Sequence, residues 1–129
     1  MKTTTMKNTE PRAGRDMEKA LSVLIHEARR SDASLRVRTR RLAALFAIAA
    51  MDPGRGEHSR AVCVRRARNL LRGPVRATAL SARAAQRLDK RIRAACAEAA
   101  TDAALPEWVR ARAQAFNGFE TEAPTRRNR

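Results

Sequence analysis

The sequence predicts an all-α protein, a single bundle of about five helices, on three observations. No segment alternates polar and apolar residues over the length of a strand, and β-branched residues are sparse. Apolar residues instead recur three and four positions apart in five segments, which Gly, Pro or short polar stretches separate. With 129 residues, the chain has the size of one ordinary domain and is too short for two.

The ends of the chain set the expected domain organisation. Residues 1–15 carry Thr, Asn, Pro, Gly and basic groups without periodicity, which is typical of a flexible basic arm. Residues 16–117 form the expected bundle, and residues 118–129 form a polar tail. We expect Asp16 to cap the first helix, which ends near Arg30 where cations suit the negative end of the helix dipole.

The second helix is expected to begin after a Ser34 cap and to end near Met51. Its run LAALFAIAAM has about half of the roughly 20 residues that a membrane-spanning helix needs, so it predicts a core helix. A loop with two Gly and one Pro follows. The side of this helix expected to be buried comprises Leu35, Leu42, Leu45, Phe46 and Ala49.

Three more helices complete the bundle. The third is expected over residues 57–72, before Gly73 and Pro74, and the fourth from Thr78 or Ser81 to about residue 100. The fifth should have Pro106 in its first turn and end at residues 117–118. The expected inward residues are Ala61, Val64, Ala67 and Leu71, then Ala84, Leu88, Ile92, Ala95 and Ala99, then Val109, Ala113 and Phe116.

Charge is the strongest functional signal in the sequence. Lys and Arg outnumber Asp and Glu by 28 to 13, which gives a formal net charge of +15. Such a surplus opposes folding through self-repulsion, so it points to a polyanionic partner, with nucleic acid as the first candidate. Arg far exceeds Lys, and the guanidinium group binds phosphate through paired hydrogen bonds.

The cations concentrate in the third and fourth expected helices. Arg65, Arg68 and Arg72 lie three and four residues apart and should share one helical face. The second helix opens with four Arg at the positive end of its dipole, an unfavourable choice that suggests a reason outside the fold. The candidate nucleic-acid-binding residues are Arg36, Arg40, Arg65, Arg66, Arg68, Arg72, Arg76, Arg83, Arg87, Lys90 and Arg91.

Catalytic and metal-binding patterns are missing from the sequence. His26 should be partly buried beside the first helix's apolar face, and His58 should be solvated. Cys63 and Cys96 fit no CxxC or zinc spacing and are expected to be buried core residues. We therefore expect no enzyme, no metal or other cofactor, and no small-molecule substrate. The N-terminus lacks the apolar centre of a secretory signal, which favours a cytoplasmic protein with no membrane partner.

Aromatic residues make up only 3% of the chain, too few for a platform on which bases stack. The expected mode of binding is therefore contact with the RNA or DNA backbone, which is tolerant of sequence. If about six cations each neutralise a phosphate, log K should fall against log salt with a slope of about −4 to −5.

Several segments in succession resemble a known family. LAALFAIAAMDPGRGEHSRA, VRRARNLL, RLDKRIRAACAEAATDAALPEW and WVRARAQAF resemble the small helical subunit of multi-subunit, Cascade-type CRISPR effector complexes. The positions that carry the resemblance are Arg65, Arg66, Leu70, Leu71 and Trp108. It implies a non-enzymatic subunit, present in more than one copy beside other effector-complex subunits, that holds RNA or DNA strands by their backbones while base pairing supplies specificity.

Two alternatives remain open. The third and fourth helices could form a helix-turn-helix regulator, although Gln86 is the main side chain suited to reading bases there. Alternatively, the basic surface could dock an acidic protein, as an interaction module.

Overall fold

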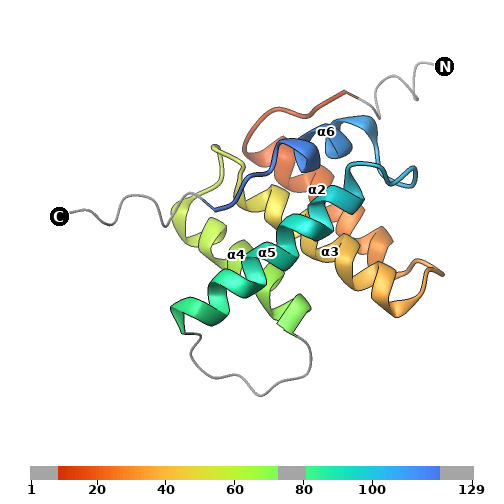
Figure 1. Cartoon of the computed structure of the whole chain (residues 1–129). Coiled ribbons are helices and arrows are strands. Elements are labelled where there is room, and N and C mark those ends of the chain that lie inside the picture. Colours follow the sequence, from red (N-terminus) through yellow and green to blue (C-terminus); the bar gives the residue numbers. More distant parts are fainter. Residues whose placement is uncertain (1–8, 73–80, 120–129) are drawn as a thin grey trace.

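A computed structural model gives the structure of the protein and describes residues 9–72 and 81–119 (Figure 1). Over these residues the chain forms five α-helices and no strand, which confirms the all-α prediction. The helices are α2 (Arg15–Arg29), α3 (Leu35–Ala50), α4 (Glu57–Arg72), α5 (Ala82–Ala99) and α6 (Glu107–Ala115). The expected position of Thr78 and the stop at Gly73 and Pro74 lie outside the described residues.

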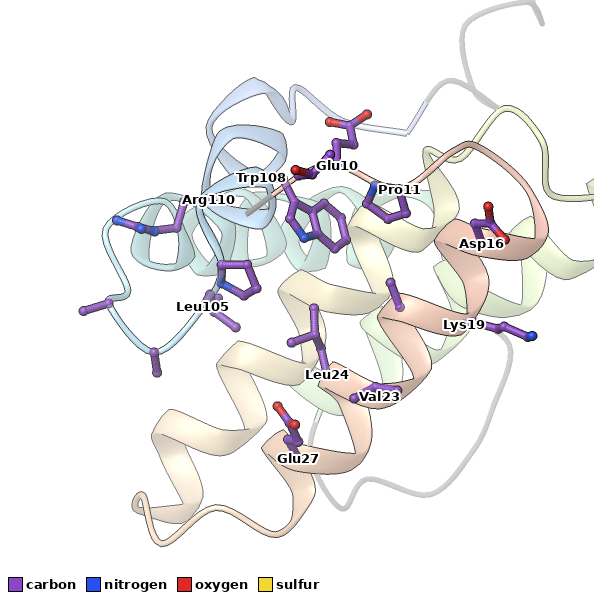
Figure 2. Close-up of a pocket in the computed structure, with 15 residues that line it drawn as sticks. Glu10, Pro11, Asp16, Lys19, Val23, Leu24, Glu27, Leu105, Trp108 and Arg110 are labelled. Carbon is purple, nitrogen blue, oxygen red and sulfur yellow. The ribbon is translucent and has the colours of Figure 1, made fainter. Parts of the chain in front are cut away.

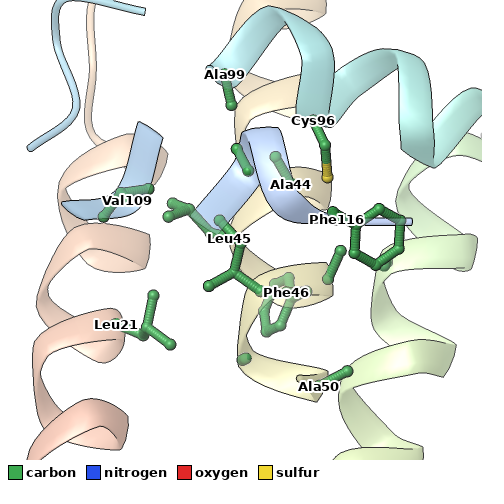
Figure 3. Packing of buried hydrophobic residues seen from close by; sticks show 14 of the residues in the cluster. Leu21, Ala44, Leu45, Phe46, Ala50, Cys96, Ala99, Val109 and Phe116 are labelled. Carbon is green, nitrogen blue, oxygen red and sulfur yellow. The ribbon is translucent and has the colours of Figure 1, made fainter. Parts of the chain in front are cut away.

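Helix α3 is the centre of the bundle. Nine consecutive residues, 42–50, are buried, so this part of the helix is covered on all sides. It packs against α2, α4, α5 and α6. Figure 3 shows Leu45 of α3 between Leu21 of α2 and Cys96 of α5. Five of the nine residues are Ala, whose small side chains let the neighbouring helices come close to the α3 backbone.

Most of the expected inward residues are buried or partly buried, as the periodicity predicted. Leu35 is an error, because it is 71% exposed in the first turn of α3. This first turn comes before Arg40, the residue of α3 whose side chain pairs with Glu98 of α5. Ala61 is also exposed: it precedes the buried Cys63 by two residues, about 200° around α4.

His26 was expected to be partly buried and is exposed. The buried face of α2 passes through Met17 and Leu21. His26 lies nine residues after Met17, which is two and a half helical turns, and therefore projects from the opposite face. His58 is exposed, as expected.

The ends of the helices agree with the sequence in two cases and differ in a third. Ser34 caps α3 by accepting the N–H of Val37 at 3.2 Å, and Ser81 caps α5 in the same way. Asp16 is not a cap, since α2 begins one residue earlier and its N-cap is Gly14. Pro106 is the N-cap of α6 rather than a residue of its first turn.

A buried carboxylate explains the start of α2. Asp52, in the turn after α3, is 2% exposed, and its oxygens accept the Gly14 N–H at 3.0 and 3.1 Å and the Gly54 N–H at 2.9 Å. Gly14 has a φ of 91°, a conformation that favours glycine. The contact fastens the beginning of α2 to the α3–α4 turn, although the two glycines are far apart in sequence.

The described part of the expected flexible arm, residues 9–14, is held against the bundle. Glu10 forms an ion pair with Arg112 of α6, and the carbonyl oxygen of Arg12 accepts the N–H of Met17 at 2.9 Å. These contacts, with the Gly14 contact to Asp52, bring the segment into the fold. Residues 1–8 and 120–129 of the expected arm and tail lie outside the described residues.

The contact between Gly54 and Gly14 can be tested with Gly54→Ala. A Cβ at position 54 would lie 2.5 Å from the backbone nitrogen of Gly14 and 2.7 Å from its Cα. Both are backbone atoms, which cannot rotate away as the end of a side chain can. We expect a loss of about 1–3 kcal/mol in unfolding free energy, measured by urea denaturation. Gly56→Ala is the matched control, because nothing lies within 4 Å of its added Cβ, and it should change stability by less than about 0.5 kcal/mol. Equal stability of the two variants would contradict the close approach.

Trp108 provides a second test of the fold. Its side chain is 6% exposed and belongs to the core cluster. Trp108→Ala should lower the unfolding free energy by about 3–5 kcal/mol in the same denaturation experiment. Leu35→Ala removes an exposed side chain and should cost far less. A Trp108→Ala protein as stable as the parent would show that the ring does not hold the core.

Candidate nucleic-acid interface

The exposed side of α5 carries four cations close together that have no acidic partner among the described residues. Arg83, Arg87, Lys90 and Arg91 are exposed, and we call them the α5 cationic face. They lie within about 100° of the helix circumference and about 12 Å of its length. No carboxylate of the described residues pairs with any of the four, and only Arg91 has a described contact, a hydrogen bond to the Leu71 carbonyl oxygen at 3.3 Å.

Arg68 of α4 is bound to a carboxylate inside the fold and is not an exposed cation that a ligand could contact. Its Nε and Nη2 donate to the two carboxylate oxygens of Asp89, both at 2.8 Å. The side chains are only 17% and 15% exposed, so the pair is a partly buried strut between α4 and α5. The Arg68 guanidinium also lies 5.5 Å from the centroid of the Phe119 ring. The helical spacing from Arg65 to Arg72 could not reveal Asp89, which comes from another helix.

Two of the other predicted α4 cations, Arg65 and Arg72, lie seven residues apart and therefore on one face of the helix, whereas Arg66 lies on another. Arg65 is exposed and Arg72 is half-buried. Arg66 is exposed and lies over the Phe46 ring of α3, with 5.8 Å from its Cζ to the ring centroid. It therefore lies on the α3 side of α4, whereas Arg68 faces α5. Arg76 lies outside the described residues.

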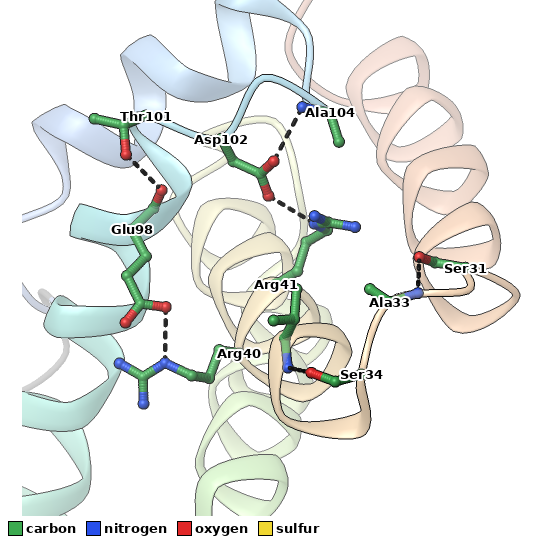
Figure 4. A network of polar contacts seen from close by, with 10 residues as sticks. Ser31, Ala33, Ser34, Arg40, Arg41, Glu98, Thr101, Asp102 and Ala104 are labelled. Carbon is green, nitrogen blue, oxygen red and sulfur yellow. Dashed lines mark hydrogen bonds and ion pairs between the residues drawn. The ribbon is translucent and has the colours of Figure 1, made fainter.

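Ion pairs inside the fold account for two of the four Arg at the start of α3 (Figure 4). Arg40 donates to Glu98 at 2.8 Å and Arg41 to Asp102 at 2.7 Å, which ties α3 to the end of α5 and the loop after it. Arg38 donates to the Arg29 carbonyl oxygen at 3.4 Å, at the negative end of α2. The inference that these Arg need a reason outside the fold is wrong for Arg38, Arg40 and Arg41. Arg36 remains exposed and has no described partner.

Both cysteines are buried and free, as the sequence predicted. Burial raises the pKa of the Cys96 thiol to about 12. Burial also raises the pKa of Cys63, although Arg55 and Arg66 oppose that shift. A thiolate is the reactive form of cysteine, so neither group is poised as a nucleophile. Among the described residues, no group of three or more His, Cys, Asp and Glu side chains could hold a metal ion.

A groove lies between α2 and the loop that leads into α6 (Figure 2). Its volume is about 910 Å³, and its walls are largely apolar, with Leu24 on one side and Leu105 and Trp108 on the other. Charged groups of both signs surround it, among them Asp16, Lys19, Glu27 and Arg110. The residues that line the groove include no Cys, His or Ser.

In the described part of the chain, no helix is long and apolar enough to cross a membrane. Comparisons with protein-family models, with curated proteins and with solved structures found no match to this chain. The resemblance to the small subunit of CRISPR effector complexes therefore stays a prediction from the sequence.

The strut between Arg68 and Asp89 can be tested with Asp89→Asn. This change leaves a partly buried guanidinium without its anion, so we expect the unfolding free energy to fall by about 1–3 kcal/mol. Glu98→Gln breaks a comparable pair whose carboxylate side chain is 57% exposed, and should cost at most about 1 kcal/mol. Urea denaturation of both variants measures the difference, and a cost at Asp89 no larger than at Glu98 would contradict the strut.

The cysteines give a prediction about reactivity. Because both thiols are buried in the folded protein, where burial also raises their pKa values, Cys63 and Cys96 should react with an aromatic disulfide reagent at pH 8 only as fast as the structure around them opens. Absorbance of the released thiolate measures the rate, with the urea-unfolded protein as control. Rapid labelling of one thiol in the native protein would contradict this expectation, because it would show that the packing around that thiol opens readily.

Proposed function

We propose that this protein binds the sugar-phosphate backbone of nucleic acid through the α5 cationic face. The observation that carries the proposal is that its four cations, Arg83, Arg87, Lys90 and Arg91, are exposed together and pair with no carboxylate of the described residues. Other cations, such as Arg40 and Arg68, are used inside the fold. Unpaired guanidinium groups on one face attract a polyanion and suit phosphate oxygens.

The placement of the aromatic rings supports backbone contact over base stacking. Phe46, Trp108 and Phe116 are buried, and Phe119 is half-buried against the Phe116 ring. These four rings are the complete aromatic set of the chain. A protein that contacts phosphates without stacking or base hydrogen bonds binds many sequences with similar affinity.

The finer proposal is the one that the sequence resemblance suggests, a small subunit of an RNA-guided effector complex. Backbone binding without base readout suits such a subunit, because base pairing with the guide supplies specificity there. Its test is co-purification of the tagged full chain from its native cells. Recovery with a guide RNA and several other protein subunits would support this role, and recovery alone with duplex of one sequence would favour the helix-turn-helix alternative.

The α5 cationic face is tested by the triple variant R83Q/R87Q/K90Q, which leaves Arg91 in its contact with Leu71. Three lost phosphate contacts should reduce the slope of log K against log salt by about 2.7 for duplex DNA, with a similar loss of affinity for every sequence. Fluorescence anisotropy with duplexes of unrelated sequence measures both quantities. Circular dichroism should remain unchanged, because the three side chains are exposed.

The control for net charge is R12Q/R15Q/K19Q, which removes three exposed cations at the start of α2. Its affinity and salt slope should stay closer to those of the parent. If both triple variants lose the same affinity, binding follows net charge alone and the assignment to α5 is wrong.

A further inference from the structure

Two arginines from different helices meet over one aromatic ring. The Cζ atoms of Arg29, at the end of α2, and Arg66, on α4, lie 6.0 and 5.8 Å from the Phe46 ring centroid. Phe46 is 7% exposed, whereas both arginines are exposed, so their guanidinium groups lie over the ring where solvent can reach them. We call these two residues the Phe46 arginine pair.

The pair has no anion of its own. Neither Arg29 nor Arg66 forms an ion pair with a carboxylate of the described residues, including Glu27 and Asp32, which are close to Arg29 in sequence. The face of the ring partly offsets the repulsion between the two guanidinium groups, and their N–H groups remain available to an oxyanion.

The pair faces away from α5, since Arg66 lies about 200° around α4 from Arg68, which faces Asp89 of α5. Arg40 and Arg41 point from α3 toward Glu98 and Asp102, and so mark the side of α3 that the end of α5 and the loop after it cover. Phe46 lies six residues after Arg40 and five residues after Arg41. At about 100° per residue, its direction is about 120° from that of Arg40 one way around α3 and about 140° from that of Arg41 the other way. The ring therefore faces away from α5.

We propose that the Phe46 arginine pair is a second binding site for a backbone phosphate of nucleic acid, so that one molecule can hold two separate segments. This inference rests on the proposed function for the kind of ligand, but it concerns different residues. A duplex is stiff over about 150 base pairs, so a short duplex on α5 cannot bend round the bundle to reach Phe46. Each site therefore takes its own segment.

The test is the number of 12-base-pair duplexes bound by one chain, measured by sedimentation equilibrium at about 50 mM salt with duplex in excess. The parent protein should bind two, and R29Q/R66Q should bind one. R29K/R66K retains both charges and should still bind two. R12Q/R15Q, which removes one cation just before α2 and one in its first turn, should also bind two. R83Q/R87Q/K90Q should keep the duplex at the Phe46 arginine pair. If R29Q/R66Q fails to fold by circular dichroism, R66Q alone replaces it with the same expectation.

The two proposals fail in different ways. One duplex per parent chain, or two duplexes on a folded R29Q/R66Q, would overturn the second site and leave the α5 cationic face intact. Absence of duplex binding by the parent would overturn both. If Arg29 and Arg66 bind polyglutamate but no duplex, the proposed nucleic-acid site is also wrong. That result would favour an acidic protein as the partner of these two arginines.

Discussion

The fold depends on the complete burial of the second half of one helix, α3. The second half of α3 is covered on every side, and four other helices pack on it, so each of them is placed relative to the others through α3. Its Ala residues bury little apolar area each, which makes close approach of the backbones the main source of packing there. Polar contacts then fix the periphery: Asp52 joins the start of α2 to the α3–α4 turn, and Arg40 and Arg41 join α3 to the end of α5.

Burial of α3 also divides the cations into two classes. Arginines near the contacts between helices, such as Arg40 and Arg68, pair with carboxylates and stabilise the bundle. Others, such as Arg83 and Arg87, are exposed and pair with no carboxylate of the described residues, and the proposed functions rest on cations of this second class. Since the Phe46 ring faces away from α5, the α5 cationic face and the Phe46 arginine pair are two separate surfaces.

Helical periodicity was informative wherever one helix has one buried face. The spacing in α5 predicted Leu88, Ile92 and Ala99 as buried and the cations between them as exposed, and both are correct. Periodicity was insufficient for a helix end that extends past its neighbours, as Leu35 does. It also could not assign Asp16 and Gly14, because the cap of α2 depends on a carboxylate 38 residues away from Gly14.

The sequence by itself determined the all-α class, the five helical segments, the Ser34 and Ser81 caps and the burial of both cysteines, because these follow from local spacing and composition. Only the tertiary structure decided which arginines are free. An ion pair such as Arg68 with Asp89 joins residues 21 positions apart, and whether a guanidinium meets a carboxylate or solvent depends on how two helices cross. The sequence therefore predicted an excess of positive charge, and the packing of the helices decided where that charge can act.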